Sequence, residues 1–69
     1  MLFTDVSSAR AVKAFQRTGF LIVKKGKHIG MTNGIRKIII PRHPRINPYT
    51  LKAIIRDVGL TDEEFKKLL

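Results

Sequence analysis

The dipeptide Asn33-Gly34 limits the fold of this chain more than any other feature of its sequence. Both residues tolerate the positive φ of a type I′ turn, and apolar segments flank them, so the dipeptide predicts a β-hairpin. A two-residue loop gives the expected pairs Thr32–Ile35, Met31–Arg36, Gly30–Lys37, Ile29–Ile38 and His28–Ile39. This register puts His28 and Lys37 on one face of the sheet, and it puts the expected core side chains on the other: Ile29, Met31, Ile38 and Ile40.

Further signals surround this hairpin. Residues 20–25 are rich in β-branched and aromatic side chains and predict a first strand, and Pro41 is expected to end the third strand. Before the first strand, Ser7 or Ser8 can cap a helix that Gly19 ends in a left-handed turn.

Two helices are expected after the third strand. Asn47 is a good N-cap and is followed by a proline at the first helical position. Gly59 closes the apolar stripe of this helix, which consists of Leu51, Ile54, Ile55 and Val58. Thr61 and Glu64 have the spacing of a capping box and begin a short last helix. The order α-β-β-β-α, with a short C-terminal helix and a three-stranded antiparallel sheet, predicts an α+β sandwich of the double-stranded-RNA-binding-domain type.

Charge is segregated along the chain. From Arg10 to Arg56 there are twelve lysines and arginines and no aspartate or glutamate, in a chain of net charge +9. Such a distribution creates a long-range field that concentrates phosphate ligands. The sequence therefore predicts a polyanion-binding surface, and the expected RNA contacts are Lys24, Lys25, Lys27, Lys37 and Arg42.

The length and composition of the chain limit the classes of protein to which it can belong. A chain of 69 residues has room for one core, so residues 1–69 are expected to form a single domain. There is no cysteine, which leaves neither a disulfide framework nor a thiolate metal site, and no signal peptide or long apolar run is visible. We expect a soluble cytoplasmic protein without membrane contact, metal or small-molecule cofactor.

Several short motifs, in their order and spacing, resemble the HicA toxin family. The matching segments span nearly the whole chain and are Lys13-Ala14-Phe15 through Gly19-Phe20, Gly26-Lys27-His28, Ile40-Pro41-Arg42-His43, Asn47-Pro48 with Thr50-Leu51 and Ile54, and Gly59-Leu60 followed by Glu63-Glu64-Phe65. The family often has Gly-Ser-His followed by a second histidine. This chain departs from that pattern, with Lys27 before His28 and Ile29 after it.

The resemblance implies a ribonuclease toxin of a type II toxin–antitoxin pair, which cleaves messenger RNA and is neutralised by a HicB antitoxin. It also implies that the histidine after the glycine, His28 in this chain, is the catalytic residue. The chemistry of the residues agrees, since a neutral imidazole can remove the proton of a ribose 2′-hydroxyl, a general-base contribution of about 10²- to 10⁴-fold. Because residues 10–56 contain no carboxylate, we expect a metal-independent reaction.

Simpler interpretations of the same residues stay open. His28 can be a solvated surface histidine, and His43 can be a loop residue or a general acid. Lysines near a sheet edge also protect against aggregation, and Ile39 on the outer face can mark a partner surface. The alternative function is a non-catalytic double-stranded-RNA-binding-like module, although the second helix has no lysine before Lys52. A third is a basic protein that binds an acidic partner chain.

Overall fold

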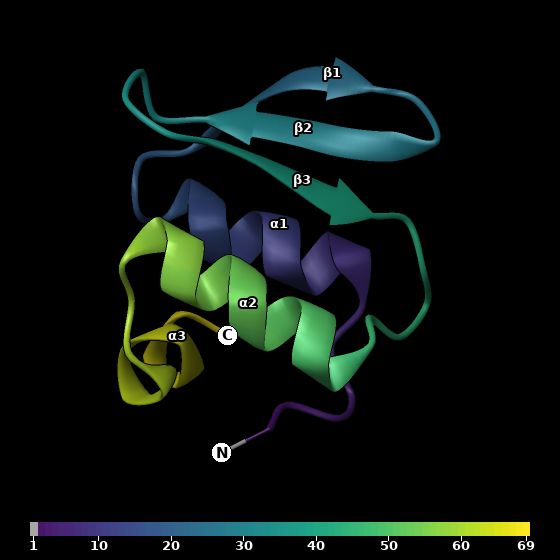
Figure 1. The fold of residues 1–69 in the computed structure, drawn as a ribbon, viewed down its shortest axis with the longest axis vertical. Helices are drawn as coiled ribbons and strands as arrows, with labels where there is room; N and C mark the ends of the chain where they lie inside the picture. Colours follow the sequence, from purple (N-terminus) through teal and green to yellow (C-terminus); the bar gives the residue numbers. More distant parts are fainter. Residues whose placement is uncertain (1) are drawn as a thin grey trace.

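The helices of this protein cover one face of a small sheet. The computed structural model describes residues 2–69, in which the elements follow the order α-β-β-β-α-α. The elements are α1 (Ser8–Gln16), β1 (Leu21–Lys25), β2 (His28–Thr32), β3 (Lys37–Pro41), α2 (Pro48–Val58) and α3 (Asp62–Leu68). The strands form one antiparallel sheet in the order β1-β2-β3, and Figure 1 shows the helices together on one side of it. The predicted fold class is confirmed.

Each helix begins at a side-chain cap that the sequence predicts. Ser7 Oγ accepts a hydrogen bond from a backbone N–H in the first turn of α1, and Asn47 Oδ1 accepts two from the first turn of α2. Thr61 and Glu64 exchange two hydrogen bonds in a complete capping box at the start of α3. These caps satisfy backbone donors that have no partner inside a helix. Within residues 2–69, no helix combines the length and the apolar character needed to cross a membrane.

The turn between β2 and β3 is longer than the sequence predicts. Thr32 pairs with Lys37 and His28 with Pro41, so the loop has four residues, 33–36, and the predicted two-residue register is wrong. The shift along β3 is two residues, an even number, and side chains alternate between the faces with a period of two. The predicted core face is therefore correct: the side chains of Met31, Ile38 and Ile40 are buried, and Ile29 is partly buried against the core.

Side-chain contacts of the loop explain the longer turn. Asn33 Oδ1 accepts hydrogen bonds from the backbone N–H groups of Ile35, at 2.9 Å, and Arg36, at 2.7 Å. The Arg36 guanidinium in turn donates a hydrogen bond to the carbonyl oxygen of Asp57 in α2. Within the loop only Gly34 has a positive φ, of 92°, whereas a type I′ turn needs one at Asn33 too, so the predicted turn type is wrong as well. The asparagine side chain organises the loop in place of a left-handed asparagine backbone.

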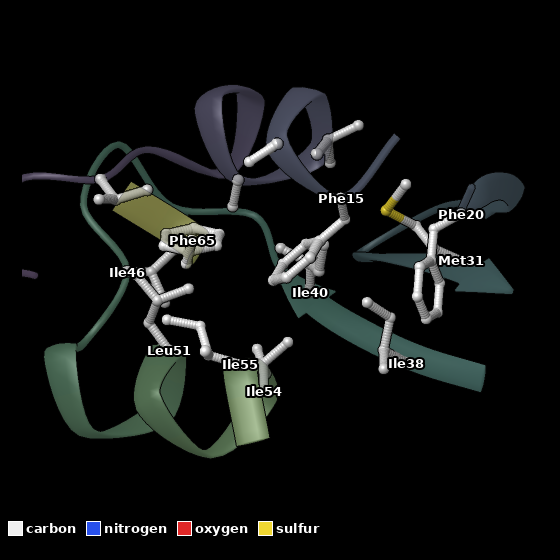
Figure 2. Close-up of a cluster of buried hydrophobic side chains, with 14 residues drawn as sticks. Phe15, Phe20, Met31, Ile38, Ile40, Ile46, Leu51, Ile54, Ile55 and Phe65 are labelled. Atoms are coloured by element: carbon white, nitrogen blue, oxygen red, sulfur yellow. The ribbon is translucent and has the colours of Figure 1, made fainter. Parts of the chain in front are cut away.

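The core lies between the sheet and the helices, with Phe15 near its centre (Figure 2). The ring of Phe15 lies 5.2 Å from the ring of Phe65 and meets the ring of Phe20 edge-on at 6.3 Å. Every helix supplies buried apolar side chains, and so do β2 and β3, whereas no side chain of β1 is fully buried. The strand β1 is thus an exposed edge strand, held by its pairing with β2.

Candidate active site

The face of the sheet opposite the helices is open to solvent. Because side chains alternate along a strand, this open face carries residues 28, 30 and 32 of β2 beside residues 41, 39 and 37 of β3. His28 and Lys37 therefore lie on the same face, and both side chains are exposed. A ligand can approach them there without displacing any part of the core.

A β-bulge in β1 brings Lys24 to this open face. The pairing of β1 with β2 slips by one residue between Ile22 and Lys24, which leaves Val23 as an extra residue. A one-residue slip reverses the facing of every side chain after it. Lys24 therefore lies opposite Gly30 on the open face, and Lys25 belongs to the other face at the edge of the sheet. Bulges next to active sites often aim a side chain in this way.

The open face is hollowed around these residues. A depression of about 580 Å³ is lined by Lys24, Gly26, Lys27, His28, Gly30, Lys37 and Ile39. Gly30, which is itself buried, lies in the central strand between Lys24 on one side and Ile39 on the other. This volume is within the usual range for small-ligand sites, and it is large enough to hold a nucleotide.

The backbone that carries His28 is held from two sides. His28 is the first residue of β2 and follows the tight turn of Gly26 and Lys27, in which the Gly26 N–H donates to the carbonyl oxygen of His28 at 3.1 Å. Arg42, just after β3, donates from Nη1 to the carbonyl oxygen of Gly26, also at 3.1 Å. These contacts fix the turn while the imidazole of His28 stays exposed to solvent.

The depression is cationic. Its charged lining residues are three lysines, Lys24, Lys27 and Lys37, and the imidazole of His28 lies among them. The carboxylates lie elsewhere: Asp5 pairs with Arg45 at 3.3 Å, Asp57 is in α2, and the other three are in the first turn of α3. Among residues 2–69, no group of three or more histidine, aspartate or glutamate side chains could hold a metal ion. The arrangement attracts polyanions and offers one base.

The structure brings together most of the residues that the sequence singled out. The depression includes His28, Lys24, Lys27 and Lys37. It does not include Lys25, which belongs to the other face, or Arg42, which binds the turn from outside. His43 also lies outside the lining, and its backbone is bound by Ser8, whose Oγ donates to the His43 carbonyl oxygen at 2.8 Å and accepts from the His43 N–H at 3.0 Å.

Sequence reasoning did not identify Gly30 as part of the site. A signal was present, because glycine weakens the interior of a strand and often marks a place where a ligand comes close. The bulge at Val23 that places Lys24 beside it has no such signal in the sequence. Ile39 was expected on the outer face, and 57% of its surface is exposed there.

Comparison with known proteins gives one finding. The sequence model of the HicA toxin family, described as HicA toxin of bacterial toxin-antitoxin, matches residues 8–60, which is most of the 69-residue chain. The matched range includes all three strands, α1, α2 and every residue that lines the depression. No curated protein matches the chain.

Proposed function

The chain belongs to the HicA toxin family and is thereby the toxin of a bacterial toxin–antitoxin pair, and on this premise we propose that it is a metal-independent endoribonuclease acting on messenger RNA. His28 is its catalytic residue. One observation supports this most strongly: the exposed His28 shares an open depression with three lysines, and no carboxylate lines it. We infer that the enzyme works in the cytoplasm, where its substrate is.

In the proposed reaction the neutral imidazole of His28 removes the proton of a ribose 2′-hydroxyl. The 2′ oxygen then forms a bond to the adjacent phosphorus, the bond from phosphorus to the 5′ oxygen breaks, and the leaving oxygen takes a proton from water. The products are a 2′,3′-cyclic phosphate end and a 5′-hydroxyl end, and the imidazolium returns its proton to solvent. Lys27 and Lys37 line the same depression as His28 and offset the negative charge that builds on the phosphorane.

The proposed antitoxin partner is a protein of HicB type. The chain carries a net charge of +9, and the open face has no helix over it. An acidic segment laid across Lys24, Lys27 and Lys37 gains the same electrostatic attraction as RNA and covers His28 at the same time. Inhibition by such a partner is therefore competitive with RNA.

The two histidines of the chain provide a matched test of the proposed function. Cleavage of a long single-stranded RNA in excess EDTA is compared for the wild type, His28→Ala and His43→Ala. We expect His28→Ala to lose at least about 100-fold in rate while its RNA affinity stays nearly unchanged, since the lysines remain. His43→Ala is expected to keep its activity, because His43 lies outside the depression. Full activity of His28→Ala would refute the base, and binding without cleavage by the wild type would favour a non-catalytic module.

A further inference from the structure

A second cationic surface lies on the layer of helices. The side chains of Arg10, Lys13 and Arg17 are exposed, and they lie three and four residues apart in and directly after α1. Residues at these spacings are neighbours on one side of a helix, so the three side chains form a stripe, here called the α1 stripe. The stripe borders a small hollow of about 110 Å³. The residues that line this hollow are Arg10, Lys13, Arg17, Leu68 and Leu69.

Two cations of the α1 stripe are oriented by backbone carbonyl groups. Arg17 donates from Nη1 to the carbonyl oxygen of Leu68 at 2.7 Å, and Arg10 donates from Nη1 to that of Asp5 at 3.3 Å. A guanidinium has five N–H donors, so each arginine keeps others for a ligand. The helix α1 contains no carboxylate, and the carboxylate of Asp5 pairs with Arg45. The stripe therefore presents oriented donors whose charge is not neutralised within the hollow.

The helix gains no stability from the charges at positions 10 and 13. Arg10 is in the first turn of α1, where the positive end of the helix dipole disfavours a cation. Lys13 follows Arg10 by three residues and precedes Arg17 by four, and like charges at such spacings destabilise a helix. Alanine is also the better helix former at both positions. A bound anion would relieve the repulsion along the stripe.

We propose that the α1 stripe binds phosphate groups of the RNA outside the cleavage site, an inference that rests on the proposed function. Arginine side chains bind phosphate oxygens through parallel hydrogen bonds, and lysine adds a point charge. The hollow of about 110 Å³ has the volume of about four water molecules. It admits a phosphate group but not a whole nucleotide. The stripe itself extends about 10 Å along the helix, so it offers room for more than one phosphate.

The α1 stripe and the depression around His28 belong to different parts of the molecule. The depression is on the open face of the sheet, whereas α1 is in the layer of helices on the other face (Figure 1). The two linings share no residue, and the Cα trace measures 17 Å along its shortest axis. A strand has to pass around an edge of the sheet to contact both. The stripe is therefore expected to strengthen binding of long RNA, and a trinucleotide in the depression does not reach it.

A double variant of the stripe has a matched control in α2. Arg10→Ala/Lys13→Ala removes one arginine and one lysine from the stripe. Lys52→Ala/Arg56→Ala removes the same two residue types from the neighbouring helix, outside both hollows. Both are made in a His28→Ala background, so that the RNA stays intact. Affinity is measured by NMR titration for a trinucleotide and by fluorescence anisotropy for a 20-nucleotide single-stranded RNA.

We expect the stripe variant to weaken binding of the 20-nucleotide RNA about five- to twentyfold. The negative slope of log K against log salt should become shallower by about 1.4, which is about 0.7 for each of two contacts. The control should cause a smaller change in both quantities. On the trinucleotide the two variants should be equal, since they reduce the long-range field alike.

Three results would overturn the proposal. The first is an equal loss in the stripe variant and the control on long RNA, which would show that only net charge matters. The second is an equal loss of the stripe variant on both RNAs. The third is a loss confined to an antitoxin, which would make the stripe a protein contact.

The design separates this inference from the proposed function. Binding is measured without cleavage, so a chain that never cleaves RNA can still show the stripe. With His28 intact, the stripe variant should cleave a trinucleotide like the wild type and cleave long RNA with a raised KM. An unchanged KM on long RNA would overturn the stripe and leave the nuclease intact.

Thermal unfolding checks that each variant folds. The unfolding temperature of the stripe variant is expected at or above that of its parent, because the repulsion along α1 is reduced. Arg17 is kept in every variant, because its hydrogen bond to Leu68 joins the end of α1 to α3. If the double variant does not fold, Lys13→Ala decides alone, since it only shortens an exposed side chain.

Discussion

Arg42 donates a hydrogen bond from Nη1 to the carbonyl oxygen of Gly26, at 3.1 Å. The bond joins the exit of β3 to the turn between β1 and β2, and that turn leads directly into His28. A guanidinium has five N–H donors, so this contact leaves others free for a phosphate. The residue predicted as an RNA contact thus also positions the turn that carries the proposed base.

Arg42→Ala is therefore expected to lower kcat for RNA cleavage about three- to tenfold, since a loosened turn misplaces the imidazole. The free energy of unfolding should stay within about 0.5 kcal/mol of the wild type, because the bond is exposed. Arg45→Ala is the control: it removes the same charge, but its partner is Asp5 rather than the turn. The measurements are cleavage at saturating RNA and urea unfolding. A rise in KM alone, equal in both variants, would show that Arg42 acts only through its charge.

The capping box of α3 makes stability depend on pH. The backbone N–H of Thr61, followed by its hydroxyl group, stabilises the Glu64 carboxylate and holds the pKa of Glu64 below its ordinary value. A carboxyl whose pKa is lowered by folding stabilises the protein above its unfolded pKa, and this contribution disappears as pH falls through the folded pKa. Glu64→Gln keeps a hydrogen-bonding side chain but removes the titration.

We therefore expect the wild type to lose its stability advantage over Glu64→Gln as pH falls from about 7 to about 3. Thermal unfolding of both proteins across this range measures the difference between them. A difference that is the same at every pH would show that the Glu64 carboxylate is not coupled to folding.

The sequence predicts which side chains of the sheet face the core, but it does not predict the length of the loop that joins β2 to β3. The alternation of apolar residues alone places Met31 and Ile40 in the core, because burial of one sheet face decides which alternate residues of each strand point inward. The length of the loop depends instead on the side chain of Asn33 and on the contact of Arg36 with Asp57. The second contact joins residues far apart in sequence, and no local pattern contains it.

The starts of the helices were predictable because their signals are local, whereas α1 ends at Gln16, before the predicted end at Gly19. Each helix has an N-cap residue directly before its first turn, and these residues are Ser7, Asn47 and Thr61. The composition of the candidate site was only partly predictable, since it depends on the register between β1 and β2. Nothing in residues 21–25 marks a bulge, and the slip at Val23 decides which lysine faces the depression.

That slip leads to a prediction about two neighbouring residues. Lys24 lines the depression, whereas Lys25 lies on the other face of the sheet, and both side chains are exposed. Replacing either by alanine removes one positive charge and reduces the long-range field by nearly the same amount. A difference between Lys24→Ala and Lys25→Ala therefore reports direct contact with the RNA backbone.

We expect Lys24→Ala to weaken binding of single-stranded RNA about three- to tenfold. The negative slope of log K against log salt should become shallower by about 0.7, the value for one phosphate contact. Lys25→Ala should cause a smaller change in both quantities. Anisotropy titrations between about 50 and 200 mM salt measure them. If the two variants were equal in affinity and in slope, the RNA would respond to net charge alone, and the bulge at Val23 would have no role in binding.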